Sequence, residues 1–140
     1  MSITEEIIPL GRENAIKFVE GIYGFESINE YYLEPVGDDL SVLILQSANT
    51  RVPSFVVINP FLITDDYCPV LSDEEIKALG AESQQELAFY VIAVVKEDYK
   101  KTVVNLKSPI VINPKSRLAK QIILDNCDYP IRFAIFGNEG

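Results

Sequence analysis

Hydrophobic and polar positions along this chain follow the short periods that are typical of β-strands. Apolar, β-branched and aromatic runs are separated by turn residues such as Gly21, Gly24 and the polar stretch 37–39. The run 88–95 is continuously apolar and rich in β-branched and aromatic side chains, which favours a strand buried on both faces. The pattern predicts nine strands, at residues 15–19, 31–36, 42–46, 54–59, 88–95, 102–106, 110–113, 120–124 and 131–136.

Helical signals are few. Ser72 followed three residues later by Glu75 is the signature of a capping box, and the acidic residues between them suit the positive end of a helix dipole. Gly80 is a suitable C-terminal stop, so the sequence predicts a helix over 73–79. A second helical turn is expected over 26–30.

Many short strands with few helices and no strand–helix alternation indicate a mainly β fold. We predict a small antiparallel, closed or nearly closed β-barrel with one or two short helices. The chain has 140 residues and no composition break, repeat or low-complexity linker, so a single domain over 1–140 is expected.

The charge balance bears on the kind of partner. The chain has 21 acidic and 12 basic residues and a net charge of -9, which weighs against direct nucleic-acid binding because phosphate contacts need clustered lysine and arginine. An acidic protein suits a basic protein partner. The alternative is that the acidity only keeps the protein soluble.

Compartment and thiol chemistry follow from similar reasoning. No window approaches the roughly 20 apolar residues that span a bilayer, and the first residues are acidic where a signal peptide would be basic. We therefore expect a cytoplasmic protein without membrane contact, in which Cys68 and Cys127 are free thiols. Two cysteines without a histidine are too few for a thiolate zinc site.

Catalytic chemistry has little support. The chain has no histidine, which excludes Ser-His-Asp and Cys-His arrangements within it, and no glycine-rich phosphate loop appears. The best acid–base or cation-binding candidates, Asp65 and Asp66 beside Tyr67, are expected to lie in a solvated loop. We predict no catalytic residue, no metal and no cofactor. A small-molecule-binding barrel, or a hydrolase that uses the aspartate pair, is the competing interpretation.

One stretch, residues 105–124, contains a recognisable sequence motif. Its sequence NLKSPIVINPKSRLAKQIIL resembles the signature of the FliW family of flagellar assembly factors, N-L-x-x-P-[IV]-x-[IV]-N followed by Q-x-[IV]-L. Other segments resemble the same family in order and spacing: GIYGFE at 21–26, LQS at 45–47, FVVINP at 55–60, DY at 66–67, and a tyrosine and arginine at 129 and 132.

This resemblance implies a non-enzymatic cytoplasmic barrel with two protein partners. One is CsrA, a small basic RNA-binding dimer that represses flagellin synthesis, and the other is flagellin. Flagellin awaiting export would occupy the protein, and its export would release the protein to bind and antagonise CsrA. A flagellin chaperone without a role toward CsrA is the alternative within the same family.

The residues also indicate where a protein partner would bind. A loop and helix start that combine carboxylates, one aromatic ring and a helix N-terminus are suited to a basic partner. Two asparagines of the matched motif lie at strand ends, where a sheet edge accepts an added segment, although such amides also satisfy local turn backbone. The predicted protein-binding residues are Asp65, Asp66, Tyr67, Asp73, Glu74, Glu75, Asn105 and Asn113.

Overall fold

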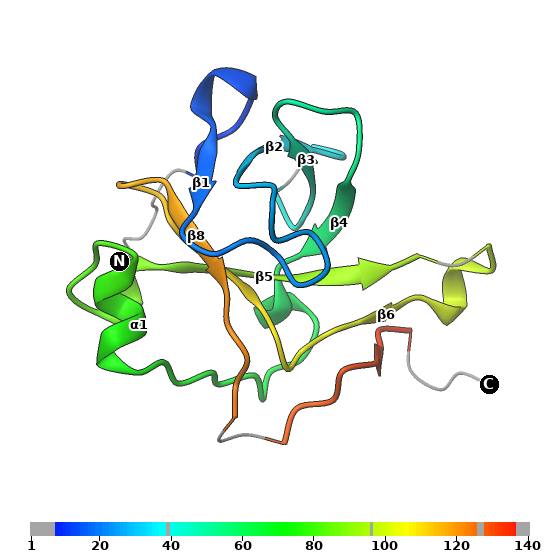
Figure 1. Ribbon diagram of the computed structural model, residues 1–140. Coiled ribbons are helices and arrows are strands. Elements are labelled where there is room, and N and C mark those ends of the chain that lie inside the picture. The colour runs from blue at the N-terminus through cyan, green and yellow to red at the C-terminus, as the bar shows by residue number, and fades with distance from the viewer. Residues whose placement is uncertain (1–7, 39, 96, 126–127, 137–140) are drawn as a thin grey trace.

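The computed structural model describes residues 8–38, 40–95, 97–125 and 128–136 (Figure 1). Cys127, expected to be a free thiol, lies outside these residues, whereas Cys68 is an exposed free cysteine. Within the described part of the chain, nine strands form one sheet, and each overlaps a predicted strand. They are β1 (Ile16–Phe18), β2 (Glu30–Pro35), β3 (Val42–Ser47), β4 (Ser54–Ile58), β5 (Ala88–Val94), β6 (Val103–Val104), β7 (Ile110–Asn113), β8 (Leu118–Gln121) and β9 (Phe133–Ala134).

The sheet closes into a barrel, which confirms the predicted fold class. Its strands follow the order β4-β3-β2-β1-β8-β7-β5, and pairing between β4 and β5 completes the ring. One feature differs from the prediction of an antiparallel barrel, because β1 and β8 are parallel. The reason is topological: the seven strands of this ring are an odd number, so strand directions cannot alternate all the way around it.

A small sheet extends from the barrel along the second half of β5. Ala93 and Val94 pair with β6, and β6 pairs in turn with β9. Figure 1 shows β5 and β6 running outward together from the barrel. Strands β6 and β7 share one edge of β5 and are separated by a connection that leaves the ladder.

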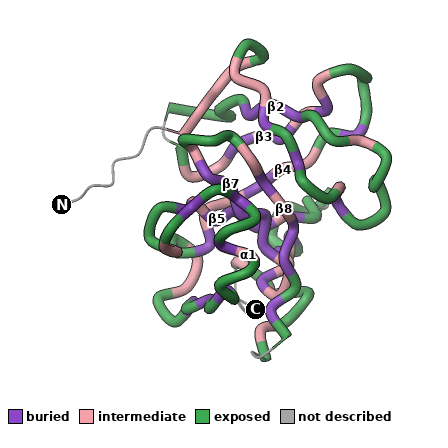
Figure 2. The backbone as a smooth tube through the Cα atoms, turned by 60° about the vertical axis from the view of Figure 1, so that its left-hand side comes forward, coloured by how far each residue is buried: buried purple, intermediate pink, exposed green. Residues whose placement is uncertain are grey.

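Two apolar cores lie on opposite faces of β5. Every strand of the ring contributes to the first core, which therefore fills the barrel interior. The second lies outside the barrel, where the outer faces of β5 and β7 are covered by a helix and by loop segments. Tyr90 points into the interior, whereas Phe89 and Val91 point into the outer core, which confirms the expectation of a strand buried on both faces. Figure 2 shows buried positions along the strands and exposed positions along the loops.

The predicted helix is present as α1 (Asp73–Ala78), and its capping box is complete. The Glu75 amide donates to Ser72 Oγ at 3.1 Å, and the Ser72 amide donates to Glu75 Oε1 at 3.1 Å. Gly80 follows the helix with a φ of +77°, a left-handed value that glycine adopts without the steric cost of a Cβ. Short 3₁₀ turns complete the described helical structure: η1 (Arg12–Asn14), η2 (Pro60–Leu62), η3 (Gln84–Glu86) and η4 (Tyr99–Lys101).

The helical turn expected over 26–30 is wrong. Residues 26–27 instead form a turn in which the Ile28 amide donates to the Phe25 carbonyl at 3.0 Å, directly after a first turn over 22–25, and Glu30 already begins β2. Gly21 packs so closely that a Cβ there would lie 2.6 Å from the Glu26 Cα. Two successive turns thus take the place of the expected helix.

Candidate functional site

The segment that runs from within η2 into the first turn of α1, residues 61–75, contains most of the predicted binding residues, and we call it the acidic segment. It runs along the outside of the barrel toward α1 (Figure 1). The segment has little secondary structure before α1, so side-chain contacts fix its path.

Tyr67 anchors this segment from the inside. Its side chain is only 5% exposed, its hydroxyl donates to the Leu106 carbonyl at 2.7 Å, and its ring centroid lies 4.7 Å from that of Tyr129. The expectation that Tyr67 offers a surface aromatic is therefore wrong. A buried phenol needs both apolar neighbours and an acceptor, and the outer core provides both.

Two further side chains hold the acidic segment, and sequence reasoning gave neither of them this role. Tyr129 accepts a hydrogen bond from the Cys68 amide at 2.7 Å and donates to the Asp66 carbonyl at 3.1 Å. Gln84 donates to the Pro69 carbonyl at 2.7 Å and accepts from the Leu71 amide at 2.9 Å. The backbone of the segment is thus tied to the body of the protein at several points.

Four carboxylates of the acidic segment face solvent. Asp65, Asp66, Asp73 and Glu74 are all exposed, and none of them forms an ion pair with a described residue. Glu75 is different, because it is half-buried and its carboxylate caps α1. The structure thus leaves four of the five predicted acidic side chains available for contact and assigns the fifth to the helix.

Exposed apolar side chains accompany these carboxylates. Phe61 is 45% exposed, Leu62 is 67% exposed and Val70 is 57% exposed. A surface that combines apolar contact area with unpaired negative charge is suited to a partner surface that is basic and partly apolar. Among the described residues, no group of three histidine, cysteine, aspartate or glutamate side chains is placed to hold a metal ion.

The two predicted asparagines serve turns. Asn105 Oδ1 accepts from the Lys107 amide at 3.0 Å and from the Ser108 amide at 3.1 Å. Asn113 is 3% exposed, donates to the Leu79 carbonyl at 2.8 Å and accepts from the Lys115 amide at 2.9 Å. This geometry favours the alternative in which both amides satisfy local backbone, and Asn113 also links the end of α1 to the β7–β8 turn.

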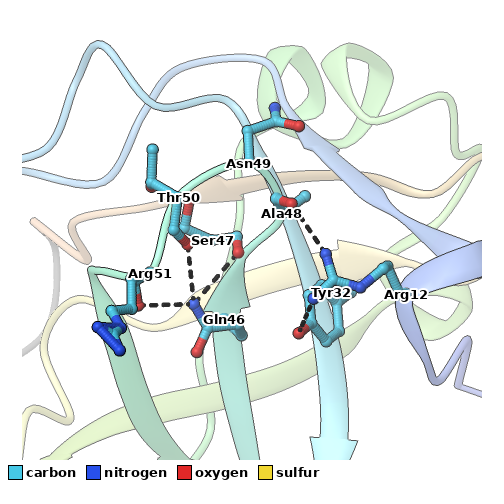
Figure 3. A pocket seen from close by; sticks show the side chains of 8 residues that line it. All are labelled: Arg12, Tyr32, Gln46, Ser47, Ala48, Asn49, Thr50 and Arg51. Atoms are coloured by element: carbon cyan, nitrogen blue, oxygen red, sulfur yellow. Dashed lines mark hydrogen bonds between the residues drawn. The ribbon is translucent and has the colours of Figure 1, made fainter.

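A polar pocket of about 410 Å³ lies on a different part of the barrel, beside the β3–β4 loop (Figure 3). Gln46 organises this loop, because its Nε2 donates to the carbonyls of Ser47, Thr50 and Arg51. Arg12 closes the other side. The only sequence signal here was the LQS motif at 45–47, which gives no hint of a pocket. The lining residues are Arg12, Tyr32, Gln46, Ser47, Ala48, Asn49, Thr50 and Arg51.

None of the helices in the described part of the chain is both long and apolar enough to cross a bilayer.

Fold and surface together define a small mixed β-barrel protein that presents an acidic, partly apolar segment. Comparison with known proteins gives this class a name. The sequence profile described as FliW protein matches residues 4–135. The chain is 41% identical to the flagellar assembly factor FliW of Caldicellulosiruptor bescii over 132 residues, which cover 94% of this chain and 86% of that protein. It is 40% identical to the flagellar assembly factor FliW of Ruminiclostridium cellulolyticum over 124 residues, covering 88% and 84% of the two chains.

A solved structure agrees. The chain superposes on a crystal structure of the flagellar assembly factor FliW with a TM-score of 0.85 and 34% sequence identity, covering 95% of this chain and 93% of that one. The chain therefore belongs to the FliW family of flagellar assembly factors.

Proposed function

We propose that this protein is a non-enzymatic cytoplasmic switch that binds the translational regulator CsrA and is sequestered by flagellin. Unexported flagellin binds the protein and keeps it from CsrA, and export of flagellin releases the protein to antagonise CsrA. Flagellin synthesis is thereby coupled to flagellin export. Family membership supports a role in flagellar assembly, and the acidic segment is the observation that supports a basic protein partner.

Charge complementarity carries the assignment of CsrA to the acidic segment. Asp65, Asp66, Asp73 and Glu74 present negative charge that no described basic side chain neutralises. A basic partner approaching this surface is steered by long-range attraction, which raises the association rate and makes that rate sensitive to salt. The exposed apolar side chains of the same segment then supply desolvated contact once the two surfaces meet.

The fixed path of the segment matters for affinity. Tyr67, Tyr129 and Gln84 hold its backbone before any partner arrives. A surface that is already ordered loses less conformational entropy on binding than a free loop does. The outer core thus supports binding by ordering the acidic segment, although its side chains do not face the partner.

The experiment reverses two charges at a time, with a matched control. Asp65→Lys with Asp66→Lys is compared with Glu34→Lys with Asp38→Lys, two acidic residues that are exposed elsewhere. Both double variants change the net charge from -9 to -5, since two acidic residues become two basic ones. The pair in the acidic segment should slow association with CsrA from the same organism by about tenfold at low salt and flatten its salt dependence.

The control pair should keep most of the wild-type association rate. Stopped-flow or biosensor kinetics at several salt concentrations separates local steering from bulk charge. Equal effects of the two double variants would remove the acidic segment from the proposal. Binding to flagellin with no detectable binding to CsrA would favour a chaperone without a regulatory role.

A further inference from the structure

The pocket beside the β3–β4 loop differs in charge from the rest of the molecule. Among the residues that the structure describes, two arginines and no acidic residue line it, in a chain that has 21 acidic and 12 basic residues. The acidic segment contributes no residue to this lining. A locally positive hollow on a protein of net charge -9 needs a physical account of its own.

Arg12 is held in place at this pocket by neutral groups. Its Nη1 donates to the Ala48 carbonyl at 3.2 Å and its Nη2 donates to the Tyr32 hydroxyl at 3.1 Å. The guanidinium carbon also lies 4.8 Å from the centroid of the Tyr32 ring. No described carboxylate forms an ion pair with it. The guanidinium is therefore fixed in place, and no carboxylate of the described residues neutralises its charge.

The opposite wall of the pocket is ordered as well. Gln46 Nε2 gathers three loop carbonyls at 3.0 to 3.2 Å, and the hydroxyls of Ser47 and Thr50 lie 2.7 Å apart. Figure 3 shows Arg12 beside Tyr32 and Ala48, and Arg51 on the far side of Gln46. Arg51 therefore adds positive potential rather than a second point of contact.

We propose that this pocket binds a carboxylate group through Arg12 and the Tyr32 hydroxyl. A guanidinium has five N–H donors in a planar fork, and the described hydrogen bonds of Arg12 use two of them. The Tyr32 hydroxyl accepts from Arg12, so its own proton remains to be donated. A carboxylate matches both the planar fork and the added donor.

A singly charged ligand fits better than a phosphate dianion. The Glu30 carboxylate lies next to the pocket, since Asn49 Nδ2 donates to its Oε1 at 3.4 Å. This negative group and the overall charge oppose a second negative charge on the ligand. The single fixed guanidinium neutralises one negative charge on the ligand, and the neutral donors add hydrogen bonds without further positive charge.

The test is a titration of the full-length ¹⁵N-labelled protein with sodium acetate, with sodium chloride at equal ionic strength as reference. Acetate should shift the backbone amides of residues 48–51 in a saturable way, and chloride should not. Arg12→Gln should weaken acetate binding by about tenfold or more, because it removes a charge-assisted contact. Tyr32→Phe keeps the ring beneath Arg12 and should weaken binding less. Arg132→Gln, an exposed arginine outside the lining, is the matched control and should bind like wild type.

Further arms identify the source of the carboxylate. Acetyl-Gly-Glu-Gly-amide should shift the same amides, whereas acetyl-Gly-Gln-Gly-amide should not, if a protein side chain is the ligand. Binding of acetate without binding of the glutamate peptide would assign the pocket to free small acids. The proposal is overturned if acetate shifts do not saturate, if Arg12→Gln binds like wild type, or if inorganic phosphate at pH 7.5 binds more tightly than acetate.

Discussion

The buried amide of Asn113 gives a quantitative test of how the end of α1 is attached to the barrel. Asn113→Ala removes the 2.8 Å bond to the Leu79 carbonyl and the 2.9 Å bond from the Lys115 amide. Each such bond contributes about 1 kcal/mol, so the variant should lose about 2 kcal/mol of unfolding free energy. The loss stays at this level because Ser116 Oγ also donates to the Leu79 carbonyl, at 2.9 Å, and continues to satisfy it.

The double variant isolates that second bond. In Asn113→Ala with Ser116→Ala, the carbonyl of Leu79, a fully buried residue, loses both donors. An unsatisfied buried acceptor costs about 1–3 kcal/mol, so the double variant should be destabilised by about 1 kcal/mol or more beyond the sum of the single variants.

Urea unfolding followed by circular dichroism measures all of these variants. Asn105→Ala is the comparison, because it also removes two hydrogen bonds but its side chain is half-buried rather than buried, so water can replace the lost acceptor. It should lose less stability than Asn113→Ala. Two results would refute the structural role assigned to this amide. One is a double variant whose loss of unfolding free energy equals the sum of the two single losses, and the other is an Asn113→Ala variant within about 0.5 kcal/mol of wild type.

Three other predictions concern the barrel and its turns. The Tyr31 hydroxyl is buried without a hydrogen-bond partner among the described residues, so Tyr31→Phe should raise stability by about 1 kcal/mol in a thermal melt, and a loss would contradict the burial account. Burial raises the pKa of Tyr31 and of Tyr90 above the ordinary 10.0. Because burial favours the neutral phenol in the folded state, the unfolded state ionises first as pH rises above about 10, and the stability of the wild type then falls. Tyr31→Phe has one such phenol fewer and should therefore lose less stability than wild type between about pH 8 and pH 11 in urea titrations. Gly21→Ala should cost about 1–3 kcal/mol because its Cβ would meet Glu26 backbone at 2.6 Å, whereas Gly37→Ala, with open space around it, should be near neutral.

Local features were predictable from sequence because neighbouring residues determine them. The capping box of α1 depends on Ser72 and Glu75 alone, and both of its bonds are present. The strand over 110–113 has the predicted bounds, since turn residues flank a β-branched run. Segment 120–124 differs from the prediction: β8 is Leu118–Gln121 and ends where the Ile122 amide bonds to the Pro109 carbonyl, because proline has no N–H to complete the pair.

Features that depend on distant residues were not predictable. The parallel pairing of β1 with β8 follows from closure of the whole ring. The burial of Tyr67 could not be predicted, because the carbonyl that accepts its hydrogen bond belongs to Leu106, which is 39 residues away in the chain. The carboxylate pocket joins Arg12 to Ala48, 36 residues apart, and no local pattern marks either residue.

The roles of the predicted carboxylates were predictable from the local sequence. Their exposure was expected from composition and loop context, and four of them are exposed. The separate role of Glu75 as a cap was already present in the same sequence signal that predicted the helix. A residue that satisfies a helix end is a poor choice for charge reversal, because its replacement disturbs α1 as well as any interface.

Size-exclusion chromatography of the protein mixed with CsrA from the same organism, with and without flagellin, tests the central claim most directly. The partner-switch account predicts co-elution with CsrA at low salt and its loss when flagellin is added. Separate elution of folded protein and folded CsrA would contradict that account, as would a complex with CsrA that flagellin leaves intact.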